Sequence, residues 1–121
     1  MTVTNTLLTV DQVRIEAQMR AARALPDVIA AFPADFDAFE WNVNSRIEAC
    51  VSVRSGTRGD CHVRAGMREL AARLGMAYNE QKRRGYTSLK LVVSGTVDGV
   101  PVELWQLAEP CVCGCTPAVA A

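Results

Sequence analysis

Three cysteines near the C-terminus form the densest group of reactive side chains in the sequence. Cys111, Cys113 and Cys115 lie within five residues of one another, and thiolates this close together can bind a soft metal ion. Three residues elsewhere in the chain are candidates for a fourth ligand: Cys50, Cys61 and His62. In a zinc knuckle, however, two or more residues separate paired cysteines so that both point at the ion. Metal binding is therefore an alternative to a tail whose thiols have no function.

Cys61 and His62 lie at the start of a predicted helix. A thiol in the first turn of a helix can have a lowered pKa, which activates some nucleophilic cysteines. Adjacent helical residues point about 100° apart, so His62 is poorly placed to act as the base for Cys61. His62 is the only histidine, and the sequence has neither a nucleophile elbow nor a phosphate-binding loop. The sequence therefore predicts that the protein is not an enzyme and binds no cofactor.

Lys82, Arg83 and Arg84 form a short basic segment between Tyr78 and Tyr86. Basic side chains can bind phosphates, and aromatic rings can stack on bases. Two arginines in the helix before this segment could extend the basic surface: Arg64 and Arg68. The simpler interpretation is a charged strand edge that discourages aggregation between sheets. Nucleic-acid binding is thus an alternative function.

Composition and charge narrow the class of protein further. Thirteen basic and thirteen acidic residues cancel, so no net field attracts nucleic acid or a membrane surface. Half of the 121 residues are apolar, which is typical of a globular domain. Five cysteines and an N-terminus without signal-peptide character predict a cytoplasmic protein without structural disulfides. The arginine-rich, alanine-rich composition suggests a small bacterial or phage protein.

The stretch from 60 to 75 is the clearest predicted helix. Its apolar residues are spaced by four, three and four and lie on one stripe: Val63, Met67, Leu70 and Leu74. Asp60 can cap the helix start by accepting backbone N–H bonds, and Gly75 can adopt the left-handed conformation that ends it. This stripe must be buried, and the segments on both sides alternate as half-buried strands do.

Another helix is predicted from Val10 to about Ala24. Thr9 and Gln12 fit a capping box, in which each side chain bonds the backbone N–H of the other residue. The residue before Pro26 disfavours helical angles, so Pro26 should open a second short turn that runs through Phe32. The helix carries two apolar stripes: Val10, Val13, Ala17 and Ala24 on one, and Ile15, Met19 and Ala22 on the other. Two apolar faces need two partners. Either the helix lies between the sheet and a loop of the same chain, or one face packs on the sheet and the other on a second copy of the protein.

From Phe39 onward apolar and polar residues alternate, which predicts either one long strand or a hairpin turning at Asn44-Ser45-Arg46. Three loop residues would pair Val43 with Ile47 and Trp41 with Ala49. This hairpin is favoured because it keeps the apolar residues together on one core-facing side: Phe39, Trp41, Val43, Ile47, Ala49, Val51 and Val53.

The segments 87–97 and 100–107 flank Asp98-Gly99, the preferred pair for a two-residue type I′ turn. In that register Val97 faces Val100, Val93 faces Leu104, and Leu91 faces Gln106. The predicted core face consists of Leu89, Leu91, Val93, Val97, Val100, Val102 and Leu104. Val92 and Trp105 then face each other on the reverse side. Pro101 cannot donate a hydrogen bond, so it indicates an edge strand or lies on an unpaired side.

The sequence thus predicts an α+β fold, with one antiparallel sheet built from two β-hairpins and two helices packed on one face. The predicted order is α-β-β-α-(β)-β-β, in which 76–86 is either an edge strand or an extended loop. Residues 1–110 form the predicted single domain, and 111–121 form a flexible tail that contains cysteines.

The predicted function is that of a non-enzymatic protein–protein interaction or regulatory module that self-associates. The apolar surplus points to two sets of partner-binding residues: Trp105, Val92 and Leu107 on the last hairpin, and Ile15 and Met19 on the first helix.

Overall fold

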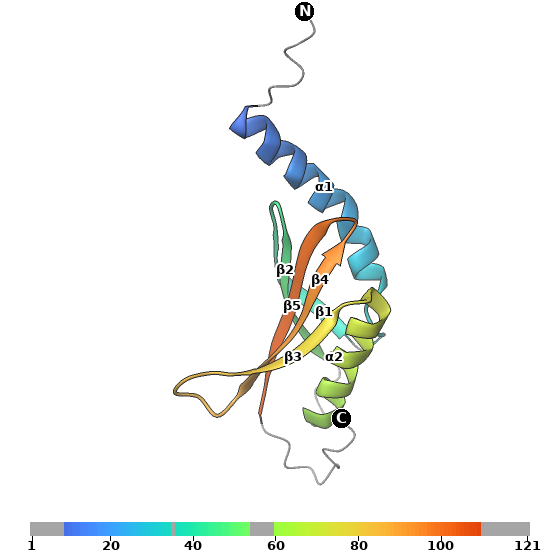
Figure 1. Cartoon of the computed structure of the whole chain (residues 1–121). Coiled ribbons are helices and arrows are strands. Elements are labelled where there is room, and N and C mark those ends of the chain that lie inside the picture. Colours follow the sequence, from blue (N-terminus) through green and yellow to red (C-terminus); the bar gives the residue numbers. More distant parts are fainter. Residues whose placement is uncertain (1–8, 35, 54–59, 110–121) are drawn as a thin grey trace, which may run out of the picture.

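The chain folds in the order α-β-β-α-β-β-β (Figure 1). The computed structural model describes residues 9–34, 36–53 and 60–109, with no side-chain detail for 53 and 60–62. The helices are α1 (Val10–Ala30) and α2 (Asp60–Leu74), and the strands are β1 (Phe36–Val43), β2 (Ile47–Val53), β3 (Ala77–Lys82), β4 (Leu89–Val97) and β5 (Val100–Ala108). The α+β class is confirmed, and the ambiguous segment 76–86 contains the strand β3.

The five strands form one mixed sheet in the order β1-β2-β5-β4-β3. Both predicted hairpins are present, but the prediction of a purely antiparallel sheet is wrong because β2 and β5 pair in parallel. The reason lies in the connection through α2. This helix carries the chain back along the sheet, so β3 runs in the same direction as β2 at the far edge. The antiparallel strands β4 and β5 then fill the gap, which leaves β5 parallel to β2.

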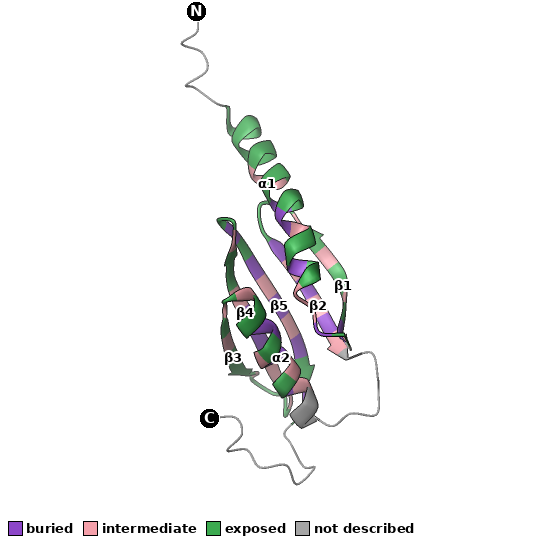
Figure 2. Cartoon of the chain, turned by 90° about the vertical axis from the view of Figure 1, so that its right-hand side faces the viewer, coloured by how far each residue is buried: buried purple, intermediate pink, exposed green. Residues whose placement is uncertain are grey.

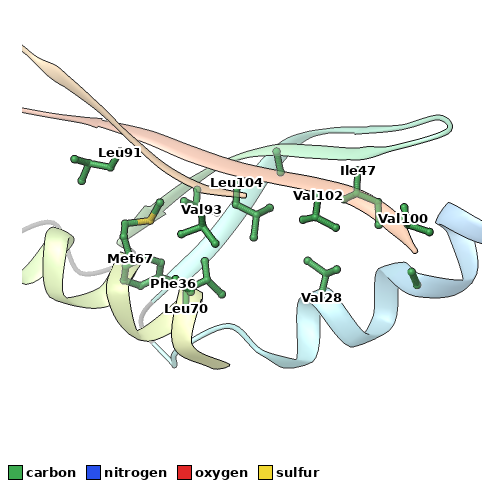
Figure 3. Close-up of a cluster of buried hydrophobic side chains, with 14 of the residues drawn as sticks. Val28, Phe36, Ile47, Met67, Leu70, Leu91, Val93, Val100, Val102 and Leu104 are labelled. Carbon is green, nitrogen blue, oxygen red and sulfur yellow. The ribbon is translucent and has the colours of Figure 1, made fainter. Parts of the chain in front are cut away.

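Both helices cover the same face of the sheet, as predicted (Figures 2 and 3). Helix α1 contacts β5, β1 and β4, whereas α2 contacts β4 and β3. Between them lies one apolar core, to which each layer contributes fully buried side chains. The largest are Ile47, Met67, Leu70, Leu91, Leu104, Val28, Val51, Val93, Val100 and Val102. The predicted α2 stripe is confirmed, because Met67 and Leu70 are buried and Val63 and Leu74 pack against the core.

Helix α1 begins at the predicted capping box and continues past the predicted end. The Thr9 hydroxyl accepts a bond from the Gln12 amide, and the Gln12 side chain accepts one from the Thr9 amide. The predicted break before Pro26 is wrong, because α1 runs unbroken to Ala30. Pro26 removes the N–H that would bond the carbonyl of Ala22. Both residues are exposed, so water can satisfy that carbonyl and the helix continues.

Helix α2 ends at Gly75, as predicted. Gly75 has a φ of 66°, a left-handed conformation that a residue without a Cβ adopts at little cost. Its N–H donates to the carbonyl of Ala72, and the N–H of Met76 donates to that of Ala71. These two bonds form a Schellman motif, which satisfies carbonyls that the helix end would otherwise leave unpaired.

The first hairpin has the predicted three-residue loop, since Val43 pairs with Ile47. The predicted pairing of Trp41 with Ala49 is wrong because a β-bulge places Glu40 and Trp41 opposite this single residue. Glu40 adopts a φ of 54° there. A bulge reverses which side chains face the core. Phe39 is consequently 45% exposed on the far side of the sheet, and the core positions before the bulge belong to Phe36 and Ala38.

The second hairpin has the predicted register throughout. Asp98 and Gly99 have φ angles of 52° and 78°, as a type I′ turn requires. The predicted core face is buried or packed against the core. Pro101 does not mark an edge strand, because β5 pairs with both β4 and β2. The pairing of β5 with β2 begins at Val102, opposite Ile47. Pro101, which has no N–H to donate, therefore lies just before the first paired residue of β5.

Candidate interaction surfaces

The sheet face opposite the helices carries a row of apolar side chains across its central strands. Phe39 pairs with Cys50, Cys50 with Trp105, and Trp105 with Val92, so the four residues are neighbours on β1, β2, β5 and β4. Val92 is buried and Trp105 half-buried, while Leu107 beside them is 45% exposed. The structure therefore brings together the three sequence-predicted residues of β4 and β5, and the bulge adds Phe39, which the sequence alone assigned to the core.

An ion pair crosses this apolar row, because Lys90 and Glu103 lie on opposite sides of the Val92–Trp105 pair. Glu103 lies 3.5 Å from the Lys90 Nζ and 3.6 Å from Arg46, and the same Lys90 Nζ lies 5.3 Å above the Trp105 ring. The Lys90 ammonium group therefore packs on one face of the Trp105 ring and helps to hold this side chain in place. Burial and the nearby Glu40 carboxylate raise the pKa of the Cys50 thiol. The thiolate that metal binding needs is therefore disfavoured at this position.

The N-terminal half of α1 extends beyond the end of the sheet (Figure 2). Near the end of the sheet, the Gln18 side chain donates a hydrogen bond to Asn44 in the β1–β2 loop over 3.3 Å. The eight residues before Gln18 make a helical segment about 12 Å long; we call residues 10–17 the α1 extension. Its apolar residues Val10 and Val13 are 83% and 52% exposed.

These exposed residues continue the stripe by which α1 packs on the sheet. Ala21, Ala24 and Val28 are buried, and Val10, Val13 and Ala17 lie on the same side of the helix at spacings of three or four. The sequence predicted that each apolar stripe of α1 needs a partner, but the sheet covers only the C-terminal half of this stripe (Figure 2). The second predicted stripe is also uncovered, with Ile15 48% and Met19 52% exposed.

The basic segment forms the tip of the β3–β4 hairpin, which projects from the sheet (Figure 1). Lys82 ends β3, and residues 83–88 form the loop. Arg84 and Tyr86 are exposed, while the Arg83 guanidinium lies 4.0 Å from the centroid of the Tyr86 ring. The structure thus groups Lys82, Arg83, Arg84 and Tyr86 at one end of the molecule.

Tyr78 and the two helix arginines are not part of that tip. The Tyr78 hydroxyl donates to Glu80 Oε2 over 2.6 Å, and the same oxygen lies 3.3 Å from the Arg64 Nε and 3.5 Å from Arg68. The Arg68 guanidinium also lies 5.0 Å from the centroid of the Tyr78 ring. These contacts join α2 to the edge strand β3. Their side chains therefore serve the fold, and Arg64 is almost completely buried.

A shallow apolar groove of about 340 Å³ lies between the end of α1 and the edge strand β1. Its lining residues are Ile29, Phe32, Pro33, Phe36, Asp37, Ala38 and Trp41. The rings of Phe32 and Trp41 lie against each other with centroids 6.1 Å apart. Sequence reasoning missed this groove because the bulge that turns Phe36 and Ala38 to the helix-covered face has no clear signal in the sequence.

Most residues of the metal-binding hypothesis lie outside the described part of the chain. Cys111, Cys113 and Cys115 lie outside the described residues, as do the side chains of Cys61 and His62. Within residues 9–34, 36–53 and 60–109, no three His, Cys, Asp or Glu side chains are grouped closely enough to hold a metal ion. Neither of the two described helices combines the length and the apolar character that crossing a bilayer requires.

Comparison with known proteins identifies no relative. No protein-family model matches the chain, and no curated protein and no solved structure matches it. The surfaces described above are therefore the basis for any statement about function.

Proposed function

We propose that this chain is a non-enzymatic interaction module that associates with a second copy of itself through the α1 extension. The observation that supports this proposal is the apolar stripe that leaves the sheet. Val10, Val13 and Ala17 continue the line of Ala21 and Val28, and no described element covers Val10 or Val13, while Ala17 is half-buried. A stripe of this kind is the part of a helix that packs against a partner.

The length of the α1 extension supports the same conclusion. In isolation, a helix of about two turns is marginal in water, because most helical stability in proteins comes from packing of an apolar face. The capping box at Thr9 and Gln12 contributes only about 1 kcal/mol. Packing of the extension against another apolar surface would supply the remainder.

A second copy is a suitable occupant for reasons of charge and shape. The extension carries one Arg and two acidic residues, and Arg14 lies 3.0 Å from Asp11. The whole chain is neutral, so two copies do not repel each other. An antiparallel pair would place Val10 of each copy near Ala17 of the other, where the small alanine allows the helices to approach closely. Antiparallel helix dipoles also attract each other.

The small size of this contact limits the expected affinity of the dimer. A pair of two-turn helices is smaller than a standard interface, which buries about 800 Å² per partner. We therefore expect a weak, concentration-dependent dimer with a dissociation constant in the micromolar range. Multi-angle light scattering and sedimentation equilibrium, from low micromolar to near millimolar concentration, measure it directly.

A matched pair of variants identifies the face that is used. Val13 and Met19 are both 52% exposed on α1, but Met19 lies about 120° around the helix from Val13, on the side away from the first stripe. We expect Val13→Glu to raise the dimer dissociation constant at least about tenfold, because it places a charge in the contact, and Met19→Glu to leave it unchanged. Circular dichroism checks that both variants remain folded.

Three outcomes would contradict the α1 contact. A strict monomer at the highest concentration would remove self-association altogether. A dimer weakened by Met19→Glu but not by Val13→Glu would move the contact to the Ile15 and Met19 stripe. A dimer weakened only by Leu107→Glu, on the open sheet face, would move it to the surface around Trp105.

A further inference from the structure

We infer that the tip of the β3–β4 hairpin is a binding site for single-stranded nucleic acid, independent of the α1 contact. The first supporting observation is its charge. Between Glu80 and Asp98 the sequence contains four cations and no acidic residue. Lys90 pairs with Glu103, whereas Lys82, Arg83 and Arg84 form no ion pair with any described residue. The one carboxylate that contacts the described loop is that of Glu109, which accepts a hydrogen bond from the Thr87 hydroxyl over 3.3 Å. Positive charge therefore remains in excess at the tip and is available for an external anion.

The second observation is the rigid geometry of the tip. The N–H of Tyr86 donates to the carbonyl of Arg83 over 3.1 Å, and Gly85 has a φ of 82°, which is the geometry of a type II turn. The Arg83 guanidinium also donates to the Ser88 hydroxyl over 2.9 Å. These bonds hold the loop in one conformation, so little conformational entropy is lost when a ligand binds.

The third observation is the aromatic platform. Tyr86 is 64% exposed, and the Arg83 guanidinium lies 4.0 Å from the centroid of its ring. A base can stack on the ring face that Arg83 leaves free, while the arginines contact the adjoining phosphates. Base stacking on aromatic side chains together with a cationic backbone contact is how proteins bind single strands without strong sequence preference. An acidic polypeptide offers the charges but no bases to stack.

The position of the tip also fits this ligand. The hairpin projects away from α1 (Figure 1), so a strand bound there is clear of the proposed helix contact. Lys82, Arg83 and Arg84 are consecutive, which limits the site to two or three nucleotides. We therefore expect weak binding that is easily displaced by salt.

Fluorescence anisotropy with a labelled oligothymidylate tests the inference on the full chain. For three phosphate contacts, the logarithm of the association constant should fall with the logarithm of salt concentration with a slope of about −2. Arg83→Ala/Arg84→Ala should make this slope shallower by about 1.4. The matched control is Arg20→Ala/Arg23→Ala, which removes the same charge from two exposed positions on α1, and it should bind like the native chain.

Tyrosine variants separate stacking from charge. Tyr86→Leu should weaken binding by between about fivefold and a hundredfold without changing the salt slope. Tyr86→Phe, which keeps the ring, should bind normally. The Val13→Glu variant should also bind normally, because the two surfaces are separate, so either proposal can fail without the other.

Several results would overturn the inference. One is no change in anisotropy at about 50 mM salt, where such contacts are strongest. Another is an equal loss of binding in the hairpin variant and in the α1 control, which would indicate a general effect of net charge. The third is a pair of results: polyglutamate displaces the labelled oligonucleotide as effectively as unlabelled oligonucleotide does, and Tyr86→Leu binds as tightly as the native chain. That pair of results would assign the tip to an acidic protein partner.

Discussion

Gly66 is the point at which the packing of α2 on the sheet can be tested most sharply. It lies inside α2, where a glycine normally lowers helix stability and alanine would raise it by up to about 1 kcal/mol. A Cβ at Gly66, however, would lie closer than 3.0 Å to the Cζ and Cε1 atoms of Phe36. Glycine is therefore required here so that α2 can lie against the aromatic ring.

The size of the effect follows from these two opposing contributions. Carbon atoms in contact are normally about 3.5 to 4.0 Å apart, so the ring or the helix must move. Phe36 is only 6% exposed, although it also lines the groove beside α1, into which its ring can partly turn. Such overpacking typically costs about 1 to 3 kcal/mol. Because the gain in helix propensity offsets about 1 kcal/mol of this cost, we expect Gly66→Ala to lower the free energy of unfolding by up to about 2 kcal/mol.

A double-mutant cycle with Phe36→Leu identifies the cause. Leucine lacks the Cζ and Cε atoms, so the added Cβ no longer meets them, although the smaller side chain itself costs about 1 kcal/mol. In the Phe36→Leu background we expect Gly66→Ala to be neutral or stabilising. Urea denaturation followed by circular dichroism measures all four proteins. The reasoning is refuted if Gly66→Ala is equally destabilising in both backgrounds within about 0.5 kcal/mol.

Two further predictions concern polar groups near α2. Burial and the hydrogen bond to Glu80 raise the pKa of Tyr78, so its contribution to stability is fully present below about pH 10 and is lost as the pH rises further. We expect Tyr78→Phe to be about 1 kcal/mol less stable than the native chain at neutral pH. Above about pH 10, urea denaturation should show that the variant loses less stability than the native chain. Equal losses in the two proteins would contradict this. The Gln106 amide nitrogen is buried, and no described residue accepts a hydrogen bond from it. Gln106→Met should therefore raise the free energy of unfolding by about 1 kcal/mol, and a comparable loss would indicate an unseen partner.

Local features of the fold follow from short stretches of sequence. The capping box, the type I′ turn at Asp98 and Gly99, and the left-handed Gly75 each depend on interactions within a few residues. The apolar stripe of α2 and the core face of the last hairpin follow from helix and strand periodicity. Such features can be predicted because the backbone conformation that they need is favoured by the residues present, whatever the rest of the chain does.

The errors come from places where the surroundings of a residue, and not its local preference, decide the conformation. Pro26 remains inside α1 because the carbonyl it leaves unpaired is exposed to water. The bulge at Glu40 reverses the alternation of β1, which turns Phe39 away from the core and brings Phe36 beneath Gly66. The buried Phe36 contact offsets the cost of the irregular strand, and no pattern within the strand indicates it.

The sequence by itself determined the number and type of most elements, both hairpin loops, and the core face of the last hairpin, because these depend on periodicity and turn chemistry. Only the tertiary structure decided that β5 lies beside β2 in parallel, since strand order depends on where α2 returns the chain. It also decided which surface residues remain available. Tyr78 and Arg64 are held by Glu80 within the fold, whereas Val13 and Tyr86 remain exposed on segments that extend past the sheet.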